Sequence, residues 1–198
     1  MRSSTPHLLP LLRSRAQGDI LACVFLAPER RHSVSELSDH ARTSLQQTLR
    51  EVRRLEDAGL VRTQKAGNTR YVEVRDDNPL VKPLTELLTL SFGPIPVLTE
   101  LLDEINGVES AIIYGSWAAR YLQVPGPVPG DIDVLLLGDT DMDQVRDMAK
   151  EASHRLAREV SVRRMTMVSW KIDANTGFRE TLRDRPRVVL RGADIDEL

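Results

Sequence analysis

The chain has 198 residues, of which 41% are hydrophobic and 28% charged, and its formal net charge at pH 7 is −2. These values are typical of a globular protein with one large or two small domains, and no stretch approaches the roughly 18 apolar residues of a membrane-spanning helix. A single cysteine, Cys23, excludes an internal disulfide and a cysteine-cluster metal site. Residues 1–12 lack the cleavage site of a signal peptide, so we expect a cytoplasmic protein.

The N-terminal part begins with two predicted helices. Apolar residues recur at helical spacing over residues 20–25, and Pro28 stops the run. Ser33 and Glu36 then form a capping box, the pattern in which each residue bonds the backbone N–H of the other. We expect a short helix from this box to about His40. Basic residues slightly exceed acidic ones in this part of the chain, which directs any polyanion contact to it.

A third helix and a β-hairpin are predicted next. Apolar residues spaced over 45–55 supply one buried helical stripe, and Gly59 is a favoured residue just past a helix end. Residues 60–63 and 70–74 alternate like paired strands on either side of a turn at Gly67. Three helices followed by a hairpin form the expected N-terminal domain, residues 1–79.

This order of elements resembles the winged helix-turn-helix of ArsR-like and MarR-like bacterial regulators. The segment Leu55-Glu-Asp-Ala-Gly59-Leu60-Val61 resembles the end of their recognition helix and the start of the wing. The resemblance implies binding of double-stranded DNA by a homodimer, although winged helices also mediate protein contacts. Gln and Arg read adenine and guanine, and basic wing residues contact phosphates. The candidate DNA-binding residues are Ser44, Gln46, Gln47, Arg50 and Arg54 on the helix and Lys65, Asn68 and Arg70 on the wing.

Residues 80–96 are interpreted as a connector. Its leucines have helical spacing, and the segment Gly93-Pro-Ile-Pro96 is expected to break that helix. The leucine-rich piece either links and packs the domains or forms a dimer seam. A second amphipathic helix over residues 97–105 opens the expected C-terminal domain, residues 97–198.

The C-terminal domain contains the clearest chemical pattern in the chain. An apolar strand over residues 111–114 leads into Gly115 and Ser116, whose backbone N–H groups and hydroxyl suit phosphate oxygens. Asp131 and Asp133 begin a second apolar strand, and residues two apart on a strand point to one face. Two carboxylates on one face can share divalent metal ions.

Gly115, Ser116, Asp131 and Asp133 match, residue by residue, the Gly-Ser and Asp-x-Asp signature of the nucleotidyltransferase superfamily with a polymerase-beta-like fold. The resemblance is to its small minimal members. It implies a nucleotide site at Gly115 and Ser116, a metal site at Asp131 and Asp133, and Mg²⁺ with a nucleoside triphosphate as the bound species. Arg120 lies one place late, so its usual role in the family is not carried over.

The third carboxylate of the active family members is missing. After a polar helix over about 141–158, the strand expected at 160–167 has Ser161 at the position of that acid. Glu159 alternates onto the same face at the start of the strand and is a poor substitute. Two-metal phosphoryl transfer depends on ligands that position both ions, so nucleotide binding is favoured over turnover and no catalytic residue is assigned.

A short helix at 178–182 and a strand at 187–191 complete an α+β protein with a mixed C-terminal sheet. The preferred reading is a DNA-binding transcriptional regulator whose nucleotidyltransferase-like domain binds a nucleotide or a protein partner. The alternative is an active minimal nucleotidyltransferase, including the antitoxin of a toxin-antitoxin pair. None of the four histidines is interpreted as a metal ligand or a catalytic base.

Overall fold

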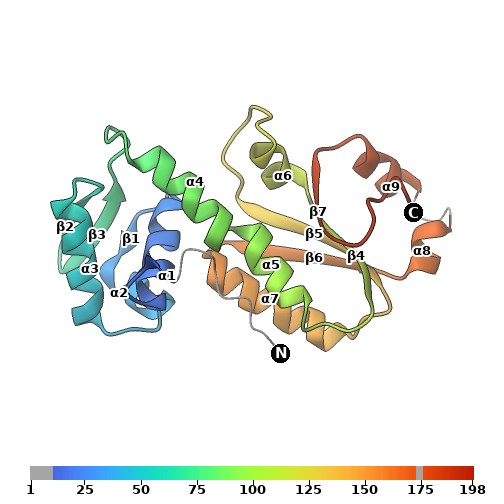
Figure 1. The fold of residues 1–198 in the computed structure, drawn as a ribbon, viewed down its shortest axis with the longest axis horizontal. Coiled ribbons are helices and arrows are strands. Elements are labelled where there is room, and N and C mark those ends of the chain that lie inside the picture. The colour runs from blue at the N-terminus through green and yellow to red at the C-terminus, as the bar shows by residue number, and fades with distance from the viewer. Residues whose placement is uncertain (1–10, 173–175) are drawn as a thin grey trace. The chain divides into compact units, whose positions relative to one another are not determined.

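The computed structural model describes residues 11–172 and 176–198 and has the mixed α+β fold that the sequence predicts. The chain divides into two compact units (Figure 1): residues up to 96 with 155–157, and residues 97–154 with 158–198. No described helix is long and apolar enough to cross a membrane. We expected no signal peptide in residues 1–12. Most of that segment, residues 1–10, lies outside the described residues.

The first unit begins with three helices, each started by a serine. They are α1 (Arg15–Phe25), α2 (Val34–His40) and α3 (Leu45–Asp57). The Ser33 capping box is confirmed, because the Glu36 N–H donates to the Ser33 hydroxyl at 3.1 Å and the Ser33 N–H donates to the Glu36 carboxylate at 2.7 Å. The short turn after α2 passes through Arg42 at φ 48° before Ser44 caps α3.

The hairpin is longer than the sequence predicted. Strands β2 (Val61–Ala66) and β3 (Thr69–Val74) pair as far as Ala66 and Thr69, because Gly67 at φ +60° makes a two-residue turn. The short strand β1 (His32–Ser33) also pairs with β3, which gives a three-stranded antiparallel sheet in the order β1-β3-β2. No local pattern predicted β1, since two residues carry no periodicity.

Residues of the expected connector contribute to the core of the first unit. Helix α4 (Val81–Phe92) buries Leu88 and Phe92 in the cluster that also holds residues of α1, α2 and β3. Gly18 of α1 makes this packing possible, since a Cβ there would lie 2.6 Å from the Phe92 ring. Cys23 is buried in the same cluster, and burial raises the pKa of its thiol to about 12. Cys23 therefore fills space as a neutral thiol.

The chain turns at Gly93 and continues immediately as α5 (Pro94–Leu102), three residues earlier than the predicted start. Pro94 fits this position because the first helical residues need no N–H donor. A Cβ at Gly93 would lie 2.3 Å from the Thr89 carbonyl oxygen, so the turn requires glycine.

The second unit is built on a four-stranded sheet in the order β6-β5-β4-β7. Strands β5 and β6 are parallel and joined by helix α7, whereas β4 pairs antiparallel with both β5 and β7. The strands are β4 (Val108–Tyr114), β5 (Asp131–Gly138), β6 (Glu159–Met165) and β7 (Arg187–Arg191), and the helices are α6 (Gly115–Tyr121), α7 (Met142–Leu156), α8 (Met167–Lys171) and α9 (Thr176–Arg183). The predicted third strand ends early because Thr166 caps α8, which the sequence analysis did not anticipate.

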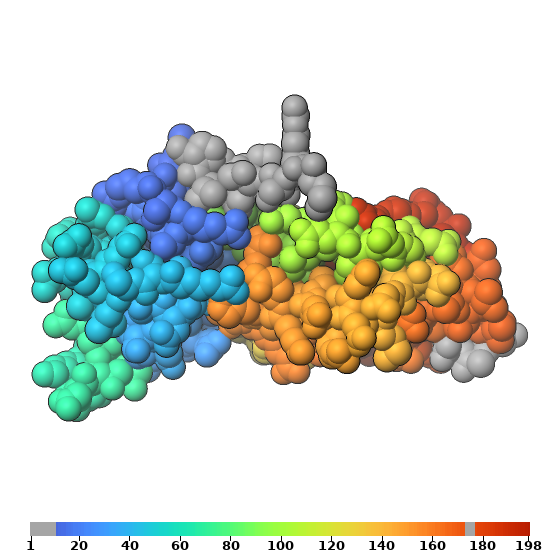
Figure 2. Space-filling model, turned by 90° about the horizontal axis from the view of Figure 1, so that it is seen from below, coloured from blue at the N-terminus to red at the C-terminus, as the bar shows by residue number. Residues whose placement is uncertain are grey.

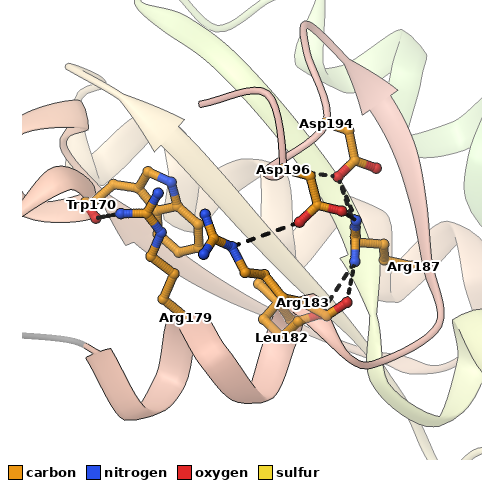
Figure 3. Close-up of polar contacts among 7 residues, drawn as sticks. All are labelled: Trp170, Arg179, Leu182, Arg183, Arg187, Asp194 and Asp196. Carbon is orange, nitrogen blue, oxygen red and sulfur yellow. Dashed lines mark hydrogen bonds and ion pairs between the residues drawn. The ribbon is translucent and has the colours of Figure 1, made fainter.

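One face of this sheet is covered by α8, α9 and the last residues of the chain. Its core residues are Ile112, Leu135, Leu137, Met165, Trp170, Leu182 and Ile195. Figure 3 shows how Arg187 of β7 holds the covering segments: it pairs with Asp194 at 2.8 Å and with Asp196, and it donates to the Arg183 carbonyl at 2.7 Å. Arg179 lies over the Trp170 ring at 5.2 Å and donates to the Trp170 carbonyl. These arginines fix α9 against the sheet.

Candidate functional site

Strand register brings the predicted metal-binding carboxylates beside Ser161. Asp133 of β5 is paired with Tyr114 of β4 on one side and with Ser161 of β6 on the other. Asp131 is paired with Glu159 at the start of β6. Paired residues share a face of the sheet, so Ser161 is the direct neighbour of Asp133 on the face that carries both aspartates.

Gly115 packs against Asp133 where β4 turns into α6. Its φ of +76° is in the left-handed region, and a Cβ at this position would lie 2.6 Å from Asp133 Oδ2. Only glycine satisfies both conditions without strain or displacement of the carboxylate. Ser116 follows with an exposed side chain. The Gly-Ser turn and the second aspartate of the signature therefore form one contact.

The two aspartates carry uncompensated negative charge. Within the described part of the chain, neither Asp131 nor Asp133 has a hydrogen bond or an ion pair. Burial, followed by the charge of Asp131, raises the pKa of Asp133 above its ordinary value. Burial and the nearby Asp133 carboxylate likewise raise the pKa of the Tyr114 phenol. Both shifts oppose further negative charge, and a bound cation would relieve that repulsion.

The residues present suit a magnesium ion shared with a phosphate ligand. Mg²⁺ is usually bound through one or two carboxylates together with substrate phosphates, which two aspartates beside a Gly-Ser turn can supply. The described residues contain no group of three or more His, Cys, Asp or Glu side chains placed to hold a metal, so Glu159 does not complete such a group. Ser161 offers a neutral hydroxyl beside Asp133.

Two functional candidates beside this site were missed from the sequence. The Arg163 guanidinium carbon lies 3.9 Å from the centre of the Phe178 ring, and that ring meets Tyr114 edge-on with centroids 5.9 Å apart. Alternation from Ser161 could have placed Arg163 on this face. Phe178 could not have been found in this way, because it reaches the site through the packing of α9.

Arg120 is occupied in the loop that follows α6. Its guanidinium donates to the Val124 carbonyl and lies against Gly126, where a Cβ would come within 2.4 Å of it. Arg120 therefore holds the loop between α6 and β5.

The predicted DNA-binding helix residues divide into exposed and occupied groups. Gln46 and Arg50 are exposed, and no polar partner is found for either within the described residues. Ser44 caps the N–H of Gln47 at 3.2 Å, and the Gln47 side chain accepts from Thr43 at 3.0 Å. Arg54 is half-exposed and pairs with the buried Glu51 at 2.5 Å.

The predicted wing residues lie at the tip of the β2–β3 hairpin. Lys65 and Arg70 are directly opposite each other, both exposed, and within the described residues neither has an ion-pair partner. Asn68 follows Gly67 in the turn and is also exposed. Like charges directly opposite each other on paired strands destabilise the pairing. An anion bound at the tip would remove this penalty.

Comparison with known proteins leaves the family open. No model of a known protein family matches the chain, and no curated protein matches it. A structural match is the haem sensor protein PefR from Streptococcus agalactiae, crystallised with haem. The two chains are 14% identical with a TM-score of 0.32, and the match covers 37% of this chain and 52% of that one, so this chain spans about half its length.

Proposed function

We propose that this protein is a cytoplasmic transcriptional regulator that binds double-stranded DNA as a homodimer. The first unit is interpreted as a winged helix-turn-helix in which α2 and α3 form the helix-turn-helix and β2 and β3 form the wing. The second unit is interpreted as a minimal nucleotidyltransferase-like domain that binds a nucleoside triphosphate with Mg²⁺. Nucleotide binding would adjust the affinity for DNA.

The like-charge pair of Lys65 and Arg70 is the observation that carries the DNA-binding proposal. A hairpin that served only to complete the domain would gain stability from an opposite-charge pair at these positions. Two cations can instead contact backbone phosphates, and neutralising phosphates is the main source of affinity for DNA. Arg50 lies on the exposed face of α3, where a recognition helix contacts base edges.

A homodimer is proposed because one winged helix buries little DNA surface, and ordinary specific affinity usually requires two. Helix α4 and its N-cap residue offer a surface for the contact: Leu87 and Leu90 are 50% and 62% exposed, and the N-cap Leu80 is 61% exposed. A two-fold dimer would place two α3 helices about 34 Å apart, one turn of DNA. Light scattering at micromolar concentration should give the mass of a dimer, and a monomer both free and on DNA would contradict this part.

The nucleotide half of the proposal rests on the contact between Gly115 and Asp133 and on the unpaired charge of Asp131. Asp131 and Asp133 would hold the metal ion, whose charge would neutralise phosphate oxygens placed at the Gly115–Ser116 turn. Ser161 beside Asp133 limits the proposal to binding, since a hydroxyl is a weaker ligand for a hard cation than a carboxylate.

DNA binding is tested by selecting genomic fragments on the purified protein at physiological salt. The proposal expects enrichment of a preferred sequence and its loss in the variant that carries both Arg50→Ala and Lys65→Ala. If no fragment is enriched and the variant does not differ from the natural protein, the proposal of DNA binding is wrong.

Nucleotide binding is tested by calorimetry with a panel of nucleoside triphosphates, with Mg²⁺ and with EDTA, beside an assay of labelled-nucleotide transfer. We expect Mg²⁺-dependent binding without rapid transfer, and transfer to rise when Ser161→Asp restores a third carboxylate. Rapid transfer by the natural protein would contradict the binding-only role. Absence of Mg²⁺-dependent binding for every triphosphate would remove the site.

A further inference from the structure

Strand β6 is an edge of the sheet in the second unit. It pairs with β5 alone among the described strands, and residues of α7 lie beside it. Figure 2 shows α7, in orange, on the surface of this unit. An unpaired edge strand is a template on which another strand can form, and natural proteins usually cover or protect such edges.

A groove of about 570 Å³ runs between the outer side of α7 and β6. It is lined by Met142, Val145, Arg146 and Ala149 of α7 and by Val162, Arg163 and Arg164 of β6. The α7 residues have the spacing of one helical stripe, and three of the four are apolar. Met142 is 69% exposed. This apolar stripe of α7 therefore extends beyond the edge of the sheet, where no described strand covers it.

The backbone of β6 has unpaired N–H and C=O groups at this groove. The N–H of Val160 is directed away from β5, since it donates to the Ser153 hydroxyl at 2.9 Å. In a parallel pair, alternate residues direct their N–H and C=O groups to the same side, so those of Val162 and Arg164 also point outward. Within the described residues, no hydrogen bond is found for these outward groups.

The charges of the groove select its occupant. No carboxylate lines it. Arg164 donates to the Thr140 carbonyl at 2.5 Å and Arg163 lies over the Phe178 ring, but within the described residues neither guanidinium has an ion-pair partner. Arg146 pairs with Asp143 at 2.7 Å on the exposed surface of α7. A second copy of this chain would bring its own two arginines to the same edge, and like charges on neighbouring strands are destabilising. An acidic strand would be attracted instead.

We propose that the edge of β6 binds an extended acidic segment of a partner protein as an added antiparallel strand. Val162 and Arg164 lie on the α7 face of the sheet and Arg163 on the other, so successive residues of the incoming strand meet different surroundings. The residues opposite Arg164, Arg163 and Val162, in that order, are acidic, acidic and apolar. The apolar residue packs beside Ala149, since Val145 is already buried, and the main chain bonds the outward groups of β6.

This interaction is tested with fluorescein-labelled peptides that contain Thr-Glu-Glu-Val-Thr, its reversed order Thr-Val-Glu-Glu-Thr, or Thr-Lys-Lys-Val-Thr. Fluorescence anisotropy should show the first peptide bound about tenfold more tightly than the other two, which corresponds to two or three cross-strand pairs. Arg164→Glu should remove most of this preference, because each peptide then has one attractive and one repulsive pair with the residues at positions 163 and 164. Lys150→Glu makes the same charge change on α7 outside the groove lining and should leave the affinities within about twofold of the natural ones.

Arg146→Glu provides a second variant if Arg164→Glu melts at a markedly lower temperature, and it should weaken binding of the acidic peptide in the full chain. Addition of the acidic peptide should also slow hydrogen exchange at the amides of Val162 and Arg164. Equal affinity of the natural protein for acidic and lysine peptides, no binding at millimolar peptide, or unchanged exchange at these amides would each overturn the proposal. Protection of the same amides by self-association alone would assign the edge to a second copy and overturn it equally.

Discussion

Replacing Lys65 with alanine should weaken DNA binding without harming the fold. Lys65 lies directly opposite Arg70 on the hairpin and has no partner among the described residues, so its removal deletes one side of a repulsive pair. Because both side chains are exposed and screened by salt, we expect the free energy of unfolding to stay the same or rise by at most about 0.5 kcal/mol. A stabilising change that lowers function is the signature of a residue kept for binding.

The effect on DNA binding follows from counterion release. One phosphate contact contributes about 0.9 to the slope of log affinity against log salt, so Lys65→Ala should lower that slope by about 0.9. A fourfold rise in salt, from 50 to 200 mM, would then weaken the natural protein by about 3.5-fold more than the variant. The loss at low salt should be similar for specific and unrelated DNA, since phosphates carry no sequence information.

The assay is fluorescence anisotropy on the selected fragment and on unrelated DNA at several salt concentrations, together with a thermal melt. Lys82→Ala is the matched control, because Lys82 is an exposed lysine of the same unit on α4. We expect Lys82→Ala to leave the slope unchanged. An unaltered slope for Lys65→Ala, or a lower melting temperature than the natural protein, would refute the assignment of the wing tip to phosphate contact.

Three further predictions concern neighbouring residues. Arg50→Ala should cost about 1–3 kcal/mol of binding on the preferred site with an unchanged melting temperature, whereas Arg54→Ala should also lower that temperature because it breaks an ion pair to a buried carboxylate. Asp133→Asn should abolish Mg²⁺-dependent nucleotide binding in calorimetry. Burial and a neighbouring carboxylate raise the Asp133 pKa above its ordinary value of 3.8. Ionised Asp133 therefore destabilises the folded protein, and this destabilisation develops as the pH rises above 3.8. Asp133→Asn should therefore stabilise the protein at pH 7 more than at pH 4 in thermal melts, and the opposite order would contradict the electrostatic account. Gly115→Ala should lower the free energy of unfolding by roughly 1–2 kcal/mol, since it forces a side chain at φ +76° against Asp133. It should also abolish nucleotide binding. Gly130→Ala, where a Cβ meets nothing within 4 Å, should be nearly neutral, and equal effects of the two alanines would show that Gly115 is not constrained.

Local signals in the sequence determined the start of α2, the hairpin turn and the face on which the aspartates lie. The Ser33–Glu36 capping box and the Gly67 turn are governed by backbone bonds within a few residues, so their sequence patterns are sufficient. Alternation along β5 likewise places Asp131 and Asp133 together, because the period of a strand is a property of its own backbone. Element ends were less accurate, as at α5, where a proline begins a helix that the sequence pattern started three residues later.

Contacts between distant segments were decided only by the tertiary structure. The parallel register that pairs Ser161 with Asp133 depends on how α7 returns the chain, and no pattern within either strand specifies it. The Arg163–Phe178–Tyr114 contacts depend on α9, which Arg187 holds through residues near the C-terminus. Such contacts join residues far apart in the sequence, and they form only because burial of the shared core outweighs the entropy of closing the loops between them. The sequence alone therefore determined which groups could act, whereas packing decided which groups meet.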